Sequence, residues 1–378
     1  MFNSSFKTKI QKFREDLHQI PELGYEEFKT QAYLKAKLIE IGFTVETVAK
    51  TGLIAIKHGT DKKAIAFRSD IDALAITEKT DVHYKSLHEG KMHACGHDGH
   101  MSILLGFALY LSKIELNKTV VLIFQPAEES PGGAKVIVES GVFEKYKIEK
   151  IFGMHLYPEI NEGKIGLTKA ELMAQVGEFD ITINAQSAHG AMPEKGIDGI
   201  LVAASLIQTY QSIISRNLNP IDSAVLTIGK ISAGDARNII AQEVTLNGTM
   251  RAFSEAVYQV IKNRIIEINN GLEKMFNVSI QTEFRDMYPA LINNYDLYLM
   301  MQDILEDSEI IDINPLMIAE DFSFYLKKVP GYFLMLGSRN DEMGYIHPLH
   351  SCYFNFTNNV LFKGIEMYIR IAKHLKLF

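Results

Sequence analysis

The feature that most constrains this fold is a fully apolar run, Val120–Phe124, set between polar residues. Such a run is typical of a strand that is buried on both faces, as in a parallel sheet covered by helices. Similar runs occur at Ala64–Phe67, Ile151–Met154 and Tyr332–Leu336, and helical stretches such as Met101–Leu111 separate them. This alternation predicts an α/β fold in which a mixed sheet is flanked by helices.

A different pattern occupies residues 178–288, where we expect the order strand, helix, strand, strand, helix, strand. The predicted strands are Phe179–Ile183, Ala224–Ile228, Glu243–Met250 and Val278–Phe284, and the predicted helices are Gly199–Ser215 and Glu255–Met275. This set makes a small α+β sandwich that could fold by itself. We therefore expect a discontinuous α/β domain, residues 1–177 and 289–378, with an inserted domain at residues 178–288.

Composition narrows the class of protein. The chain has 378 residues, of which 47% are hydrophobic and 22% charged, as in ordinary globular proteins. The net charge of −7 argues against a general nucleic-acid binder. No apolar run approaches the ~20 residues of a membrane span, and the first residues lack the apolar core of a signal peptide. The two cysteines, Cys95 and Cys352, form no disulfide framework, so we expect a cytoplasmic protein. From the charge and the lack of a long apolar run, we expect neither nucleic-acid nor membrane partners.

Polar side chains follow three of the predicted strands at the point where each strand ends. They are Asp70 and Asp72, then Glu128 and Glu129, and finally His155. In open α/β sheets, ligands bind outside the carboxyl ends of the strands. If these strands are parallel neighbours, the side chains converge on one edge of the sheet.

A fourth polar segment, His93–His100, lies just before a predicted helix and holds three histidines and Cys95. Thiolate and imidazole are ligands of zinc and of other borderline transition metals. Taken singly, each feature has an ordinary explanation: Glu128 and Glu129 could be a solvated helix start, and His155 a structural histidine. Their repetition at one predicted edge indicates a metal or acid–base site.

Other catalytic systems fit less well. The sequence holds no Gly-x-Ser-x-Gly, His-Glu-x-x-His, Walker A or Gly-x-Gly-x-x-Gly motif. A papain-like pair of Cys95 with His97 is conceivable, but the nearby carboxylates would raise the pKa of the thiol rather than lower it.

Seven blocks, in order along nearly the whole chain, resemble the M20 metallopeptidases. The resemblance is to their amidohydrolase branch, which includes N-acyl-amino-acid hydrolases, hippurate hydrolases and N-acetyldiaminopimelate deacetylases. The blocks are Asp16–Gly24, Arg68–Leu74, Met92–His100, Gln125–Glu129, Ser187–Pro193, Asn238–Ala241 and His347–Ser351. The resemblance implies a zinc-exopeptidase-like catalytic domain with an inserted lid or dimerisation domain.

The resemblance also implies two divalent metal ions and their ligands. The matching ligand positions are Cys95, His97, Glu129, His155 and His350. Glu128 matches the general base, and Asp70 and Asp72 match an acidic motif at or just behind the metals. A thiolate ligand favours zinc, nickel or cobalt, whereas carboxylates and imidazoles also suit manganese.

Three residues of the inserted domain match substrate-binding positions of the family. His189 matches a histidine that stabilises the oxyanion, often in the site of a partner subunit, so the resemblance implies a homodimer built through the inserted domain. Asn238 and Arg251 match residues that hold the substrate carboxylate, a role that suits the forked guanidinium of arginine. Without the resemblance, Arg251 could equally be a surface residue on a strand.

The resemblance implies metal-dependent hydrolysis of the amide bond of N-acyl amino acids, with N-acetyldiaminopimelate deacetylation in lysine synthesis as one candidate reaction. The stretch Glu26–Gln31 resembles the deacetylases, although we expect it to be a helix face rather than a pocket wall. Alternatives are a hippurate or other aminoacylase-type hydrolase, a dipeptidase or aminopeptidase of the same clan, and a non-catalytic binding protein on the same fold. Retention of Glu128 with all five ligand positions favours an enzyme.

Overall fold

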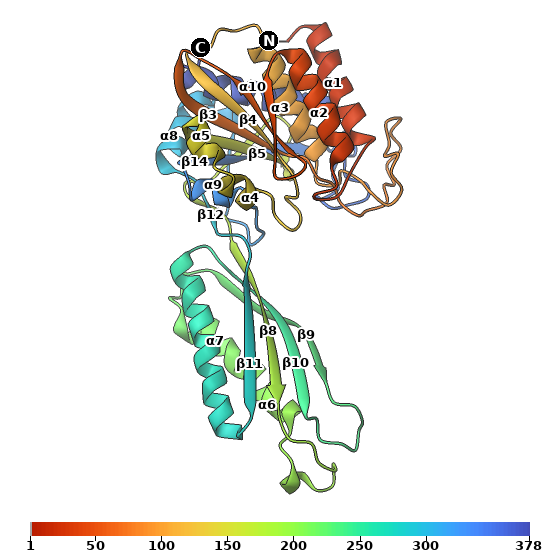
Figure 1. The fold of residues 1–378 in the computed structure, drawn as a ribbon, viewed down its shortest axis with the longest axis vertical. Helices are drawn as coiled ribbons and strands as arrows, with labels where there is room; N and C mark the ends of the chain where they lie inside the picture. The colour runs from red at the N-terminus through yellow and green to blue at the C-terminus, as the bar shows by residue number, and fades with distance from the viewer. Residues whose placement is uncertain (1) are drawn as a thin grey trace. The chain divides into compact units, whose positions relative to one another are not determined.

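The computed structural model describes residues 2–378, which form two compact units (Figure 1). Unit 1 holds the chain up to Ala170 together with Asn293–Asn314 and Asp321–Phe378. Unit 2 holds Glu171–Ile292 and Pro315–Glu320. Both ends of the described chain therefore belong to unit 1.

Unit 1 is built on an eight-stranded mixed sheet with the order β1-β2-β4-β3-β5-β14-β6-β13. These strands are β1 (Thr44–Val48), β2 (Gly52–Lys57), β3 (Asp61–Asp70), β4 (Lys118–Gln125), β5 (Ile148–Asn161), β6 (Ile165–Leu167), β13 (Ile310–Asp312) and β14 (Gly331–Arg339). The four central strands, β4, β3, β5 and β14, run parallel to one another, and β2 and β6 pair antiparallel at their two sides. The predicted mixed α/β sheet and its four apolar strands are confirmed.

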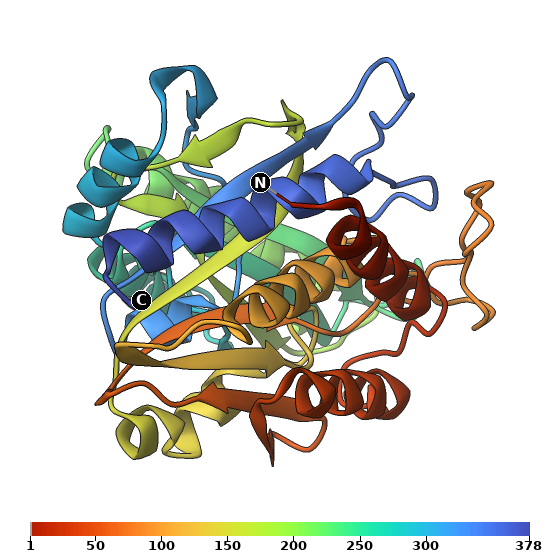
Figure 2. The ribbon, with the colours of Figure 1, turned by 90° about the horizontal axis from the view of Figure 1, so that it is seen from above.

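Helices cover both faces of this sheet (Figures 1 and 2). They are α1 (Ser4–His18), α2 (Phe28–Ile41), α3 (His97–Leu111), α4 (Ala134–Glu139), α5 (Val142–Tyr146), α8 (Tyr295–Ile304), α9 (Ser323–Leu326) and α10 (Asn358–His374). Leu122 and Phe124 of β4 join the core beneath α1, α3 and α10, whereas Phe333 of β14 packs on Phe322, beside α9, with ring centroids 4.8 Å apart. Because both faces are covered, β4 is apolar from Val120 to Phe124.

The register of the central strands brings their polar ends to one level. Asp70 of β3 pairs with Gln125 of β4, and Arg68 of β3 pairs with Gly153 of β5. Two residues further along, Asp70 is therefore level with His155. The expected convergence of the strand ends on one edge of the sheet is confirmed.

The segment that carries Cys95 reaches the same edge through a glycine turn. Gly96 has a φ of +85°, in the left-handed region, and a Cβ added to it would lie 2.6 Å from Cδ1 of Leu156. Only glycine fits both conditions. The turn lets α3 begin at His97, so Cys95 and His97 lie on the two sides of one tight bend.

Unit 2 contains a four-stranded antiparallel sheet with the order β11-β8-β10-β9. Its strands are β8 (Gln175–Asn184), β9 (Ala224–Ala233), β10 (Glu243–Ala252) and β11 (Ser279–Asp286), and its helices are α6 (Gly199–Ser212) and α7 (Glu255–Phe276). Alternate residues such as Phe179, Ile181 and Ile183 pack with both helices in one core, as their spacing predicts. A smaller sheet pairs β7 (Glu171–Met173) with β12 (Leu291–Ile292).

Within residues 2–378, no helix combines the length and apolarity required to cross a bilayer. Both cysteines are free thiols.

A buried charge cluster holds the first turn of α3 against α1. Asp98 accepts hydrogen bonds from His18 Nδ1 at 2.9 Å and from Arg14 Nε at 3.3 Å. His18 Nε2 lies 3.1 Å from Oε1 of Glu78. Because both partners of His18 are carboxylates, both ring nitrogens donate and the ring is an imidazolium. Burial lowers the pKa of His18, but Asp98 and Glu78 outweigh it and raise the pKa to about 9.

We expect His18 to make the stability of unit 1 depend on pH. The raised pKa means that its contribution is complete below the unfolded-state value of about 6.5 and is lost as the pH rises through about 9. The wild type should therefore exceed His18→Gln in unfolding free energy by a few kcal/mol at pH 6, on the order expected for a buried charge pair. Denaturant titrations from pH 6 to 10 should show this difference shrinking, and a constant difference would contradict the assignment.

Candidate metal centre

Side chains from four segments of unit 1 meet at the carboxyl edge of the sheet. Several groups of candidate ligand atoms lie within 4.8 Å of one another, and two of these groups are Cys95 with Glu129 and His350, and His97 with Glu128 and Glu129. His155 joins them through its Nε2, 3.4 Å from Sγ of Cys95. The structure thus brings together all six residues for which the family resemblance implied metal binding or general base catalysis.

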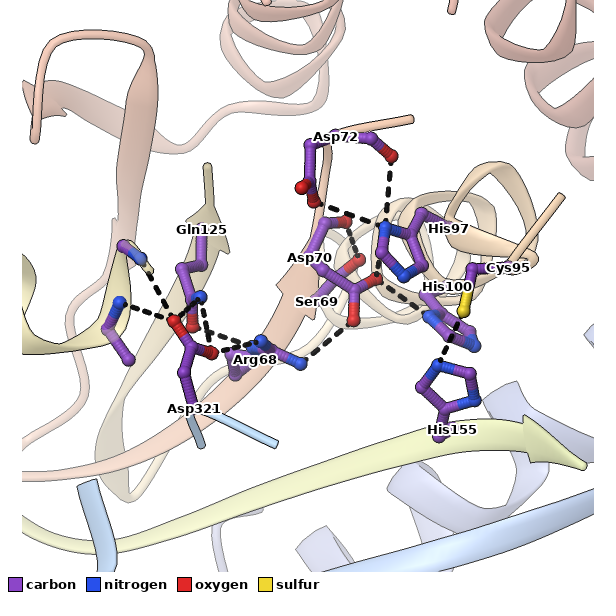
Figure 3. Close-up of polar contacts among 12 residues, drawn as sticks. Arg68, Ser69, Asp70, Asp72, Cys95, His97, His100, Gln125, His155 and Asp321 are labelled. Atoms are coloured by element: carbon purple, nitrogen blue, oxygen red, sulfur yellow. Dashed lines mark hydrogen bonds and ion pairs between the residues drawn. The ribbon is translucent and has the colours of Figure 1, made fainter. Parts of the chain in front are cut away.

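The ring of His97 is fixed by Asp72 (Figure 3). Its Nδ1 lies 2.9 Å from the carbonyl oxygen and 3.2 Å from Oδ1 of Asp72. Since a carbonyl oxygen only accepts, Nδ1 is a donor, and Nε2 is the ring nitrogen that can face a metal ion. Nε2 is buried and has no hydrogen-bond partner among the described residues. Asp72 also accepts the backbone N–H of Glu129 through Oδ2 at 3.0 Å, so one carboxylate orients two candidate ligands.

His155 is oriented in the same manner. Its Nδ1 donates to the carbonyl oxygen of Leu156 at 2.7 Å, which leaves the lone pair of Nε2 directed toward Cys95. Burial is the largest of the effects that lower the pKa of His155 to about 3. The imidazole is therefore neutral, as a metal ligand must be.

His100 lies beside these rings but is chemically occupied (Figure 3). Its Nδ1 lies 2.7 Å from Oδ1 of Asp70, and its Nε2 accepts the backbone N–H of Leu156 at 2.9 Å. Both ring nitrogens already have partners in the protein. His100 is therefore a structural neighbour of the centre, although its ring nitrogens are close to those of His97 and His155.

Asp70 is likewise occupied on both carboxylate oxygens. Oδ1 accepts from His100, and Oδ2 accepts from Nη1 of Arg68 at 2.8 Å. Burial alone would raise its pKa, but His100, His97 and Arg68 hold the pKa well below its ordinary value. The sequence left open whether Asp70 contacts a metal, and this geometry places it behind the candidate ligands.

Three residues of this edge, Arg68, Gln125 and Asp321, were not predicted as site residues. Arg68 donates from Nη2 to Oδ1 of Asp321 at 3.0 Å, and Gln125 donates to both oxygens of Asp321 (Figure 3). Oδ2 of Asp321 also accepts the backbone N–H groups of Gly133 and Ala134 at 2.9 Å. No local motif marks Asp321, because its partners lie about two hundred residues earlier in the chain. The sequence could have drawn attention to Arg68, which begins one of the family blocks.

His350 completes the centre from a loop. Its backbone N–H donates to the carbonyl oxygen of Ala94 at 2.9 Å, next to Cys95, and its Nε2 lies 3.0 Å from Oε1 of Glu129. The hydrogen bond with Glu129 raises the pKa of His350. About half of its side chain is exposed, so the centre opens toward solvent on this side.

The electrostatics of the centre suit cations. Burial raises the pKa of the Cys95 thiol well above its ordinary value, and Glu129 and Glu128 raise it further. Burial lowers the pKa of His97, but Asp70, Asp72 and Glu129 together raise it to about 10, so a bound cation would displace a proton from Nε2. Such a concentration of buried negative charge favours a divalent cation, which would also stabilise the thiolate. A thiol, three imidazoles and carboxylates form a donor set that fits zinc and related metals.

The three predicted substrate-binding residues lie in unit 2, at opposite ends of its sheet. His189 is in the loop after β8, and its bridge to Ile239 places it next to Asn238; both side chains are exposed. Arg251 lies near the far end of β10, where its Nη1 donates to the carbonyl oxygen of Met317 at 2.7 Å. Eight residues of strand separate Glu243, at the His189 end, from Arg251, or about 27 Å at strand rise. Within one chain, the structure brings together the first two of these residues but not the third.

Several known proteins are similar to this chain over most of its length. A model of peptidase family M20/M25/M40 matches residues 66–374. N-acetyldiaminopimelate deacetylase of Bacillus licheniformis is 40% identical over 331 residues, which cover 86% of this chain and 88% of the relative. N-acetyl-L-cysteine deacetylase of Bacillus subtilis is 37% identical over 378 residues, covering 98% and 89%. Among solved structures, the YXEP protein of Bacillus subtilis, described as a dinuclear metal-binding peptidase, has a TM-score of 0.87 at 29% identity over 99% of both chains.

The fold, the cluster of candidate ligands and these relatives define the chain as a hydrolase that acts on amide bonds. The chain belongs to peptidase family M20/M25/M40. The expected resemblance is therefore confirmed.

We expect Asp72→Ala to weaken metal binding without removing a candidate ligand. Loss of its carboxylate removes one of the two acceptors at Nδ1 of His97 and the acceptor of the Glu129 backbone N–H, and loss of such an orienting partner costs roughly 10- to 100-fold in metal affinity. Calorimetric titration of zinc or manganese into metal-free protein measures the change. Asp81→Ala, which removes an exposed loop carboxylate, is the control. Equal affinities for the two variants would contradict the role of Asp72.

Proposed function

We propose that this chain is a metal-dependent amidohydrolase that removes the acyl group from an N-acyl amino acid, with N-acetyldiaminopimelate as the first candidate substrate and lysine synthesis as its setting. The convergence of Glu128 with Cys95, His97, Glu129 and His155 at one buried edge carries this proposal. The names of the deacetylase relatives support the substrate class. The two free thiols suit a reducing cytoplasm.

The proposed ligands are held ready before any metal binds. His97 and His155 direct their Nε2 atoms into the centre, because Asp72 and Leu156 engage their Nδ1 atoms. We propose that these two, together with Cys95, Glu129 and His350, hold two divalent ions. When bound, such ions supply Lewis acidity to a carbonyl oxygen and lower the pKa of a coordinated water toward ~7.

Glu128 is the proposed proton carrier. Its side chain is buried at the edge of the sheet, within 4.8 Å of the candidate ligand atoms of His97 and Glu129. A carboxylate in this position would take a proton from the attacking water at one of its oxygens. It would then hand the proton to the nitrogen of the leaving amine, which departs as the free amino acid.

Glu128→Gln should abolish turnover while leaving metal binding intact. The amide keeps the shape of the side chain but cannot accept a proton, so kcat should fall by roughly 10²- to 10⁴-fold. The substrate is first chosen by assaying N-acetyldiaminopimelate, N-acetylcysteine and hippurate with zinc, manganese, cobalt and nickel. Metal content by mass spectrometry is the control measurement. A variant with wild-type kcat would contradict the role of Glu128.

We further propose that unit 2 serves as a lid and as the contact of a homodimer. His189 with Asn238, and Arg251, are too far apart within one chain to touch a single small substrate, since about 27 Å of strand lies between them. A dimer in which His189 and Asn238 serve the partner's site would remove this conflict. Strand β9 also supports a contact, because among the described strands it pairs only with β10 and exposes Ile231 at the open edge of the sheet.

Mixing two inactive variants tests this arrangement. His189→Ala and Arg251→Ala should each lose activity by themselves. In a mixed dimer, one site would receive both wild-type side chains, so an equimolar mixture after subunit exchange should recover about one quarter of wild-type activity if pairing is random. Sedimentation of each variant confirms that dimers form. If the mixture stays inactive although mixed dimers are present, the sharing of sites between subunits is wrong.

A further inference from the structure

The residue before Glu128 has a backbone conformation that needs support. Ala127 has a φ of +54°, in the left-handed region that residues with a Cβ avoid. It is fully buried and lies between Pro126 and Glu128. Strained residues of this kind persist only where several contacts hold them, and they cluster at functional sites.

One of these contacts is a buried carboxylate from a distant segment. Glu27, which lies just before α2, has no exposed surface, and its Oε1 accepts the backbone N–H of Ala127 at 2.9 Å. Its Oε2 accepts the hydroxyl of Thr51 at 2.5 Å. Glu27 therefore ties the strained peptide to the turn that enters β2. Its neighbour Glu26 differs, because it is exposed and pairs at the surface with Lys91.

The segment around Glu27 also contacts the turn that follows Ala127 at two further points. A Cβ on Gly24 would lie 2.3 Å from the carbonyl oxygen of Ser130, so the two chains touch backbone to backbone. Tyr25 donates its hydroxyl to the carbonyl oxygen of Gly132 at 3.1 Å. Gly132 in turn donates its N–H to the carbonyl oxygen of Ala127 at 2.9 Å. The block of sequence that precedes α2 is thus a brace for the turn that presents Glu128.

We infer that Glu27 is a positioning residue that acts on the reaction through Ala127, by holding the carboxylate of Glu128 in its working orientation. The inference rests on the proposed role of Glu128 as proton carrier. Without the Glu27 acceptor, the N–H of Ala127 loses its partner and the peptide can relax toward a common conformation. Because Glu128 is the next residue, such a rotation re-aims its side chain, and a misplacement of about 1 Å can cost about 100-fold in rate.

The chemistry of Glu27 predicts which substitution is tolerated. Burial is the largest cause that raises the pKa of Glu27, and its two oxygens accept hydrogen bonds from an N–H group and a hydroxyl rather than from a cation. Glutamine can accept the N–H of Ala127 through Oε1 and donate its amide to the hydroxyl of Thr51. Glu27→Gln should therefore preserve the brace, whereas Glu27→Ala removes it.

The test compares Glu27→Ala, Glu27→Gln and the control Glu26→Ala in the metal-loaded protein. We expect Glu27→Ala to lower kcat by about 10- to 100-fold while KM and metal content stay within about twofold of wild type, since the ligands and the substrate contacts are untouched. Glu27→Gln and Glu26→Ala should keep kcat near the wild-type value. A wild-type kcat in Glu27→Ala, or an equal loss in Glu27→Gln, would overturn the inference.

A second variant covers the case in which Glu27→Ala does not fold. Thr51→Val removes only the outer contact of Glu27, so it should lower kcat several-fold with unchanged metal content, and an unchanged kcat would then overturn the inference.

Hydrogen exchange at the amide of Ala127 separates this inference from the proposed function. We expect protection in wild type and Glu27→Gln and faster exchange in Glu27→Ala, or in Thr51→Val if the alanine variant does not fold. If the wild type is inactive on every N-acyl amino acid, the proposed function is refuted but the brace is not. The brace is refuted if exchange at Ala127 is unchanged in Glu27→Ala, or in Thr51→Val where that variant replaces it.

Discussion

Buried negative charge at the carboxyl edge of the parallel strands is the constraint on which the rest of unit 1 depends. Asp70, Asp72, Asp98 and Asp321 are fully buried. A buried carboxylate is tolerated only where donors surround it, and here the donors are arginine, histidine and backbone N–H groups. The segments α1, α3, α4 and β4 supply those donors, so each of them must lie against the edge.

These pairings also prepare the centre for metal. Asp72 and the carbonyl oxygen of Leu156 accept hydrogen bonds from Nδ1 of His97 and His155, so each Nε2 faces the centre. His100 belongs to the same cluster, yet Asp70 and the N–H of Leu156 occupy both of its nitrogens. The difference between a candidate ligand and a supporting residue therefore lies in hydrogen bonds, because the three imidazoles are otherwise alike in burial.

The predicted substrate-binding residues of the inserted unit lie at two distant ends of its sheet. A ten-residue strand places Arg251 at one end of the sheet and the loop of Asn238 at the other. A small substrate cannot bridge that length, so an active site that used both would need two copies of the chain. The antiparallel register, which is set by hydrogen bonding along β8 and β10, thereby sets the separation of these residues.

Much of this could be predicted from the sequence alone. The run Val120–Phe124 is apolar at every position because helices cover both faces of its strand, and such a pattern is local. The order of the polar residues after each strand was enough to predict that Glu128 and His155 meet at one edge. These features can be recognised in the sequence because periodicity and strand ends depend on neighbouring residues.

Only the tertiary structure decided which polar residues face the centre as candidate ligands and which ones support them through hydrogen bonds. Asp321 reaches Arg68 from across the chain, and no local pattern marks it. The stretch that includes Glu27 was expected to be a helix face rather than a pocket wall, but Glu27 precedes α2 and turns inward to Ala127. A side chain's partners depend on long-range packing and on the need to satisfy every buried donor and acceptor, which a sequence motif does not encode. The sequence by itself determined the sheet and the identity of the candidate ligands, and the fold decided their supports and their separation.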